Sequence, residues 1–305
     1  MPGPVLVTGA GGFVGRHVCA ALTATGATII RSEVDVTRRD ELRAVIGDSQ
    51  PRCCLHLAAI AAIGVARAEP DRAWTVNLHG TLNVAEAIRD LAPNCRMVFV
   101  SSADIYGASF RIGTALDEQA LPAPLNTYGA TKAAADLALG AMAADGLSVL
   151  RLRPFNHTGP GQNADFVVPA FARQIARIEA GQAPPVIKVG ALTPERDFLD
   201  VRDVARAYAL AIARAEALPG DLVLNIASGT PRRIGDVLTA LLALAKVEVR
   251  VEEDPARLRP TDIPRAIGDA ARARALLGWE PAIPWQETLA DVLNDWRARV
   301  RHEGG

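Results

Sequence analysis

The sequence predicts an α/β protein in which a doubly wound parallel sheet carries a smaller, interleaved α+β region. Two observations support this fold class. Short apolar runs alternate with helix-like periods through the first half of the chain, as in parallel sheets covered by helices on both faces. A glycine-rich turn at residues 9–15 joins the first of these runs to the first helix. The expected strands are residues 5–8, 28–30, 53–57, 97–101 and 149–153, and the expected helices begin at Phe13, Arg38, Asp71 and Tyr128.

The second half of the chain departs from this rhythm after residue 153, where prolines and glycines indicate a loop. A helix at 166–180, strand-like segments at 186–189, 198–201, 222–226 and 247–251, and a last helix near Pro284 follow. The predicted dinucleotide-binding part, a Rossmann-type domain, comprises residues 1–158, about 195–228 and 269–305. The second part comprises about 159–194 and 229–268, and it is assigned to nucleotide-sugar binding only by the family resemblance described below.

Composition argues against several classes of function. The 305 residues are half hydrophobic, 22% charged, and carry a net charge of -1, which predicts neither a nucleic-acid nor a membrane partner. No apolar run approaches membrane-spanning length, and no basic leader precedes the first strand, so we expect a cytoplasmic protein. The four cysteines lack metal-ligand spacing; we expect buried thiols and no metal site at Cys19, Cys53, Cys54 and Cys95.

The glycine-rich turn predicts a dinucleotide site. Gly9 permits the tight turn, Gly12 lets the backbone approach a pyrophosphate, and Gly15 lets the helix pack closely on the strand. Phe13 and Val14 open the helix, whose free N–H groups face the phosphates. A glycine triplet alone also occurs in ordinary turns, but its place between a strand and a helix favours cofactor binding.

The identity of the cofactor depends on the end of the second strand. An acid for the ribose hydroxyls is expected about 20 residues past the first glycine, and this region reads Ile29-Ile30-Arg31-Ser32-Glu33. Arg31 suits a 2′-phosphate, which favours NADP(H), while Glu33 keeps NAD(H) as the alternative. Asp35 and Val36 either flank the adenine or, in the case of Asp35, cap the helix before Arg38.

Tyr128 and Lys132 form the candidate catalytic group. Their spacing of four places both side chains on one face of a helix, where the ammonium is expected to lower the pKa of the phenol. Ser102 follows an apolar strand, at the sheet edge where doubly wound folds bind ligands. Each residue alone has a structural explanation as a buried aromatic, a surface charge or a loop cap, but the set in this order predicts redox chemistry on a carbinol or ketone.

Several longer motifs resemble the extended short-chain dehydrogenase/reductases, in particular nucleotide-sugar epimerases, dehydratases and reductases. They are residues 9–15, 56–59, 77–81, 101–107, 128–132, 153–156 and 196–203. The resemblance implies a catalytic triad of Ser102, Tyr128 and Lys132, with the latter two also touching the cofactor. It implies further cofactor contacts, or helix bracing in the case of Asn77, at Leu57, Ala58, Ala59, Asn77 and Pro154.

The resemblance also implies a sugar-nucleotide site. Arginines at 196 and 259 match those that hold a diphosphate, for which forked guanidinium donors are suited, and the acid at 262 matches one that binds a ribose. Taken singly, each arginine is more often part of a surface ion pair, here Arg196 with Asp197 and Arg259 with Asp262. The substrate-binding residues implied are Ser102, Asp104, Asn156, Val168, Lys188, Arg196, Arg259 and Asp262.

Within this family, residues 153–162, 165–169, 171–181 and 254–260 most resemble those of GDP-4-dehydro-6-deoxymannose reductases. This resemblance implies reduction of a GDP-linked 4-keto sugar to GDP-D-rhamnose. A 4,6-dehydratase stays open because Asp104 stands two residues after Ser102, where dehydratases carry glutamate, and a 4-epimerase uses the same triad. The non-enzymatic alternative is a cofactor-sensing module. The resemblance also implies a homodimer, since small residues along the helix from Tyr128 allow the close helix contact of the dimer interface in related enzymes; packing on the protein's own sheet is the alternative. These residues are Ala130, Ala133, Ala134, Ala135, Ala138 and Ala141.

Overall fold

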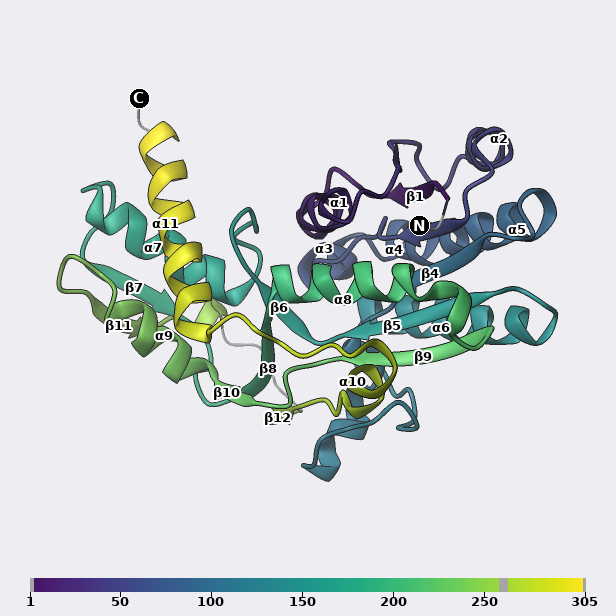
Figure 1. Cartoon of the computed structure of the whole chain (residues 1–305). Coiled ribbons are helices and arrows are strands. Elements are labelled where there is room, and N and C mark those ends of the chain that lie inside the picture. Colours follow the sequence, from purple (N-terminus) through teal and green to yellow (C-terminus); the bar gives the residue numbers. More distant parts are fainter. Residues whose placement is uncertain (1–2, 258–262, 304–305) are drawn as a thin grey trace.

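The computed structural model describes residues 3–257 and 263–303 (Figure 1). Its strands are β1 (Val5–Thr8), β2 (Ile29–Ser32), β3 (Cys53–His56), β4 (Arg96–Val100), β5 (Val149–Pro154), β6 (Asn156–Thr158), β7 (Val186–Val189), β8 (Glu195–Asp200), β9 (Asp221–Ile226), β10 (Pro231–Arg233), β11 (Arg250–Glu253) and β12 (Arg265–Ala266). Its α-helices are α1 (Phe13–Ala24), α2 (Arg39–Ser49), α3 (Ile63–Ala68), α4 (Pro70–Trp74), α5 (Thr81–Leu91), α6 (Thr127–Ala144), α7 (Val167–Glu179), α8 (Val201–Ala213), α9 (Ile234–Leu242), α10 (Ala271–Leu277) and α11 (Trp285–Glu303).

A parallel sheet forms the larger part of the molecule and confirms the predicted fold class. Among the described residues it has six strands in the order β2-β1-β3-β4-β5-β9. Successive residues of one strand face opposite sides, as β geometry requires. In β1, for example, Val5 and Val7 belong to the core under α1, α8 and α10, whereas Leu6 belongs to the core under α2, α5 and α6. Both faces are therefore buried, which explains the continuous apolar runs in the sequence.

Smaller sheets form the second part. Strand β8 pairs with β6 and β12 in parallel and with β10 in antiparallel orientation, and β7 pairs with β11 in parallel. Figure 1 shows α7, α9 and α11 gathered beside β7 and β11, away from the large sheet. Their apolar faces share one core, to which Phe171 of α7, Leu238 of α9 and Leu293 of α11 contribute.

The last helix is placed differently from the expectation that residues 269–305 join the dinucleotide-binding part. Helix α10 does pack on the large sheet, where Ala273 and Leu277 belong to its core. Helix α11 instead buries Leu289, Leu293 and Trp296 against α7 and α9. The chain crosses between the two parts at residues 278–284, and the apolar stripe of α11 determines on which side the helix ends.

The expected long helix near residue 71 is divided. A π-helical turn at Thr75–Gly80 joins α4 to α5 and carries Asn77, which is fully buried. π-Helical turns are rare in proteins, and those that occur often lie near functional sites. The four cysteines are free and buried, as predicted. Within residues 3–257 and 263–303, no helix combines the length and apolarity needed to cross a membrane, and no group of three or more His, Cys, Asp or Glu side chains is arranged to hold a metal ion.

Candidate active site

The glycine turn lies between β1 and α1 as the sequence predicts. Gly9 has a φ of +69°, and a Cβ there would lie 2.8 Å from the Ala58 nitrogen, so both its conformation and its packing require glycine. A Cβ on Gly15 would lie 2.4 Å from the Gly9 oxygen, because the first turn of α1 packs directly on the loop. Gly12 is the N-cap of α1 and has no side chain to occupy the free N–H groups.

The residues at this turn fit a dinucleotide. A Cβ built on Gly11 meets no other atom within 4 Å, so the space beside the turn is open to a ligand. The helix N-terminus faces the same space and favours a pyrophosphate there. The ring of Phe13 stacks on that of His157, with 6.3 Å between centroids. This contact fixes α1 against the second part.

A cavity of about 490 Å³ continues from the end of β2, where an adenosine is expected. Glu33, Asp35 and Arg38 are among the residues that line it. The Asp35 carboxylate accepts hydrogen bonds from the Thr37 nitrogen and hydroxyl at 3.0 and 2.8 Å, which lower its pKa. Asp35 thus caps the turn before α2 and lines the cavity as well. Arg31 is exposed on β2 and reaches the Cys19 thiol.

The backbone that follows β3 forms the next wall of the site. Leu57, Ala58 and Ala59 are partly buried there. Asn77 braces this segment, because its side chain accepts from the Ile60 nitrogen at 2.8 Å and donates to the Ile60 oxygen and to the Thr131 hydroxyl at 3.1 and 3.0 Å. Its amide is therefore fully used in holding the loop to α6, which agrees with the bracing alternative.

His56 lies beneath this wall and is fully buried. Its two ring nitrogens contact the hydroxyls of Thr8 at 2.7 Å and Thr81 at 3.0 Å. Burial, together with the charge of Lys132, lowers the pKa of His56 to about 3. The imidazole is consequently neutral at physiological pH and ties β1, β3 and α5 together.

Ser102, Asp104 and Tyr128 meet at the carboxyl end of β4. The Asp104 nitrogen donates to the Ser102 hydroxyl at 3.1 Å, and that hydroxyl lies 3.4 Å from the Asp104 carboxylate. A hydrogen bond from Ser102 also reaches the Tyr128 phenol. Helix α6 begins just before Tyr128 because Asn126 caps it, accepting from the Gly129 nitrogen at 2.8 Å. A Cβ on Gly129 would lie 2.7 Å from the backbone oxygen of Asp104, so glycine is needed at this position for α6 to pack against the Asp104 segment.

The pKa of Tyr128 differs from the sequence expectation. Burial raises it above its ordinary value of 10, the charge of Asp104 raises it further, and only the Ser102 hydrogen bond opposes them. Lys132 is 3% exposed, its nitrogen lies 4.4 Å from the centre of the Phe99 ring, and burial lowers its pKa to about 7. The two groups share a helix face, but the charge of Lys132 is not among the causes of the Tyr128 shift, which burial dominates, so the expected lowering of the phenol pKa by the ammonium is wrong for this structure.

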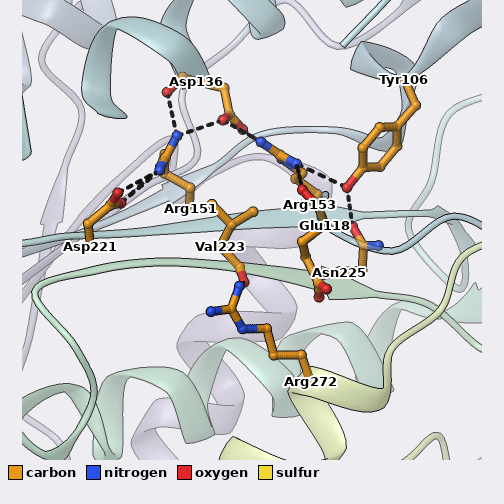
Figure 2. Close-up of polar contacts among 9 residues, drawn as sticks. All are labelled: Tyr106, Glu118, Asp136, Arg151, Arg153, Asp221, Val223, Asn225 and Arg272. Atoms are coloured by element: carbon orange, nitrogen blue, oxygen red, sulfur yellow. Dashed lines mark hydrogen bonds and ion pairs between the residues drawn. The ribbon is translucent and has the colours of Figure 1, made fainter. Parts of the chain in front are cut away.

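A largely buried charge network begins one helical turn after Lys132, at Asp136 of α6, and Figure 2 shows its members. Asp136, one turn along α6, is fully buried; its carboxylate accepts from Arg153 at 2.9 and 3.1 Å and from Arg151 at 3.2 Å. Arg153 also donates to the Tyr106 hydroxyl at 3.1 Å, which in turn donates to Asn225 at 2.7 Å. These arginines hold the pKa of Asp136 below its usual range, so the carboxylate stays charged and supports the ammonium of Lys132.

The residues predicted to bind the sugar nucleotide are only partly brought together. Asn156 is exposed at the start of β6, opposite Phe198 of β8. Arg196 is partly buried on β8, close enough to Asp104 for each charge to act on the pKa of the other. Val168 is 1% exposed in the core of the second part, and Lys188 is exposed on β7. Arg259 and Asp262 lie outside the described residues. Pro154 is buried at the end of β5.

Sequence motifs alone left three neighbours of the site without a role: Asp136, Arg151 and His56. Asp136 follows Lys132 by four residues, which places both on the same helix face. Arg151 and Arg153 alternate with apolar residues in a strand expected to be buried on both faces. A buried strand containing two arginines demands a buried acid, and this signal could have identified Asp136.

Comparison with known proteins agrees with this geometry. The model of the family described as "NAD dependent epimerase/dehydratase family" matches residues 5–227. The chain belongs to this family. The resemblance seen in the motifs is thereby confirmed, and the chain is an NAD(P)-dependent enzyme of the epimerase/dehydratase family rather than an unrelated dinucleotide-binding protein.

Individual members of the epimerase/dehydratase family match over nearly the whole chain. GDP-6-deoxy-D-mannose reductase from Pseudomonas aeruginosa is 36% identical, covering 98% of this chain and 99% of the relative. The structure of RMD from Pseudomonas aeruginosa complexed with NADPH has a TM-score of 0.87 at 34% identity, covering 97% and 99% of the two chains. Thermus thermophilus UDP-glucose 4-epimerase in complex with NAD has a TM-score of 0.84 at 28% identity, covering 96% and 99%.

Proposed function

We propose that the chain reduces the C4 ketone of a nucleotide-activated 4-keto-6-deoxyhexose with NAD(P)H, converting GDP-4-dehydro-6-deoxy-D-mannose to GDP-D-rhamnose. The observation that carries the proposal is the contact of Ser102 with the Tyr128 phenol beside the buried Lys132, at the sheet edge that also holds the glycine turn. The full-length similarity to a GDP-6-deoxy-D-mannose reductase supports the choice of reaction and base.

Each residue of the proposed triad has a distinct part in the reaction. NAD(P)H supplies the hydride for C4. Ser102 donates a hydrogen bond to the C4 oxygen and holds it beside Tyr128. Tyr128 gives its proton to that oxygen as the negative charge develops. Lys132, charged in its protonated form, stabilises the phenolate that remains, and Asn77 keeps the loop wall at Ile60 and the helix α6 in register.

For the cofactor, NADP(H) is the favoured assignment and NAD(H) the alternative. Arg31 is exposed at the end of β2, next to the cavity that begins at Glu33, where a 2′-phosphate would need a cation. The Pseudomonas aeruginosa neighbour is complexed with NADPH, whereas the Thermus thermophilus neighbour is complexed with NAD. Glu33, on the cavity wall, is the residue that would favour NAD(H).

The part around β8 is the proposed binding region for the nucleotide sugar. Arg196 lies near Asp104, and thus near the proposed C4 position, where a diphosphate one sugar away would meet a cation. Asn156 is exposed on the strand paired with β8 and is available for a further hydrogen bond. By resemblance, Arg259 and Asp262 complete this site.

Asp104 favours a second candidate, a 4,6-dehydratase. Its carboxylate lies 3.4 Å from the Ser102 hydroxyl, and burial raises its pKa above the ordinary value of an aspartate, as is common for acid-base groups. Asp104→Asn separates the two reactions. A dehydratase would lose elimination of water from GDP-mannose, whereas a reductase would keep turnover of the 4-keto sugar, since hydride and proton arrive from other groups.

The decisive experiment supplies purified protein with GDP-4-dehydro-6-deoxy-D-mannose and either NADPH or NADH and follows absorbance at the nicotinamide band. A reductase consumes the reductant, whereas an epimerase or dehydratase carries bound cofactor and needs none. Tyr128→Phe should abolish turnover. Tyr208→Phe is the matched control and should keep turnover, because it removes a buried hydroxyl that has no hydrogen-bond partner among the described residues. Undiminished turnover in Tyr128→Phe would leave the catalytic assignment without support.

A cytoplasmic homodimer is the assembly that we propose. The outer face of α6 carries Leu137, which is 57% exposed, and the exposed Ala141, a surface small enough for close helix contact. Four free, buried cysteines suit a reducing compartment. Sedimentation equilibrium should give twice the chain mass, and Leu137→Glu should give the monomer.

A further inference from the structure

Two arginines lie directly opposite each other in the sheet around β8. Strand β10 pairs with β8 in antiparallel register, and Arg232 is the partner of Arg196. Opposed residues of such a ladder have Cα atoms about 4.5 to 5.5 Å apart, with both side chains on the same face. Like charges in this position destabilise a sheet. Among the described residues, neither arginine forms a salt bridge. The charges of Asp104 and Asp197 act on Arg196 and Arg232 respectively, but without ion-pair contact, so they offset the repulsion only in part.

Arg232 is held in place by aromatic rings instead of by carboxylates. Its guanidinium lies 4.8 Å from the centre of the Trp285 ring, and Trp285 stacks on Phe198 with 5.5 Å between centroids. Its Nε is buried and has no hydrogen-bond partner within residues 3–257 and 263–303. Arg196 does donate to the Glu195 oxygen at 2.7 Å. Holding two partly buried guanidinium groups side by side without an ion-pair contact is costly, so such a pair is expected to bind an anion. Consistent with this, burial lowers the pKa of both Arg232 and Arg196.

The arginine pair lies beside the proposed catalytic group. Arg196 is close enough to Asp104 for their charges to interact, and Asp104 in turn contacts Ser102. A sugar whose C4 oxygen rests on Ser102 would therefore carry its anomeric phosphate toward β8 and β10. The cofactor's own pyrophosphate is expected elsewhere, at the glycine turn before α1.

We propose that Arg232 is a second arginine of the diphosphate site, binding the diphosphate of the nucleotide sugar together with Arg196 while Trp285 holds its guanidinium plane in position. Two forked donors side by side match the non-bridging oxygens of two linked phosphates. This inference rests on the proposed function, since it assumes that the substrate is a nucleotide sugar.

The test is direct binding of GDP-mannose, GDP and GMP to the full-length protein by calorimetry. Arg232→Gln should weaken GDP-mannose and GDP at least tenfold and GMP markedly less. Arg233→Gln is the matched control, because Arg233 is the next residue, is exposed, and belongs to the opposite face of the strand. In steady-state assays Arg232→Gln should raise KM with kcat little changed.

Arg232→Lys keeps the charge but loses the fork, and an intermediate loss of affinity for GDP is expected. If Arg232→Gln does not fold, the affinity of Arg232→Lys for GDP tests the proposed role of Arg232. Equal affinity of wild-type, Arg232 and Arg233 variants for GDP-mannose would overturn the inference. If the wild-type protein itself binds NADPH but neither GDP-mannose nor UDP-glucose, the proposed function fails instead, so the two failures are distinct.

Discussion

The buried carboxylate of Asp136 is expected to control the charge of Lys132. Burial lowers the pKa of that lysine to about 7, and among the groups that act on it Asp136 is the one that raises it. Two further groups near the ammonium, the Phe99 ring and the His56 imidazole, are neutral. Replacing Asp136 with Asn removes one negative charge while keeping the shape of the side chain, so the pKa of Lys132 should fall further.

The size of the effect follows from the titration curve. A carboxylate within a few ångströms commonly shifts a pKa by about 1 to 3 units. With a pKa near 7, about half of Lys132 is protonated at pH 7. A decrease of one unit leaves about a tenth protonated and a decrease of two leaves about a hundredth. If the reaction needs the protonated lysine, kcat/KM at pH 7 falls about 5-fold to 50-fold and recovers as the pH is lowered.

The assay is the pH profile of kcat/KM for 4-keto sugar reduction between pH 5 and 9. The alkaline limb should move to lower pH in Asp136→Asn. Asp221→Asn is the control, since Asp221 pairs with Arg151 in the same network but its side chain is 42% exposed at the far side. Loss of the buried partner of two arginines costs about 3 to 5 kcal/mol of stability, to be measured by urea unfolding. An alkaline limb that stays at its wild-type position, with a lower plateau, would refute the electrostatic role.

Three further perturbations test other parts of the structure. His56 is neutral in the folded protein because its pKa is lowered to about 3, whereas in the unfolded state it binds a proton as the pH falls below about 6.5. The free energy of unfolding should therefore fall by about 2 to 3 kcal/mol between about pH 6.5 and 4.5. His56→Gln should flatten that decline. Gly15→Ala should lower Tm strongly because its Cβ would collide with the Gly9 oxygen, whereas Gly11→Ala should keep Tm and weaken NADPH binding, as thermal melting and titration would show. Arg31→Ala should raise KM for NADPH at least tenfold and leave KM for NADH unchanged, and an equal effect on both would remove its assignment to the 2′-phosphate.

The large sheet was predictable from the sequence because its residues obey one repeated rule. Each of its strands is a short, largely apolar run, so β1 matches its expected bounds to the residue, and β3 and β5 differ from theirs by one residue at one end. The second part lacked this rule. Strand β10 has only three residues, two of them arginines, and β12 has two, so pairing with β8 rather than local hydrophobicity defines both.

The site was predictable where a local spacing carries the chemistry. Tyr128 and Lys132 on one helix, and Ser102 at the end of a strand, follow from the sequence order. The contact between Arg232 and Trp285 could not be anticipated in this way, because 53 residues separate them and only the packing of α11 on the second part brings them together. The direction of the Tyr128 pKa was likewise hidden, since desolvation depends on what surrounds a group in three dimensions.

The same burial that raises the pKa of Tyr128 favours its use as a proton donor. At pH 7 the phenol is fully protonated, while the lysine that would stabilise its phenolate is only partly charged. A carbinol is a weaker acid than a phenol, so transfer of the proton to a developing alkoxide at C4 remains favourable even from a phenol with a raised pKa. Reduction should therefore proceed without any prior ionisation and should slow above about pH 7 as Lys132 loses its proton. Oxidation of the product alcohol needs the phenolate together with the charged lysine, so its rate should rise with pH up to about pH 7 and stay constant above it. Measuring both directions with one enzyme preparation checks this asymmetry. An oxidation rate that falls as the pH rises would show that Tyr128 is not the group exchanging the proton.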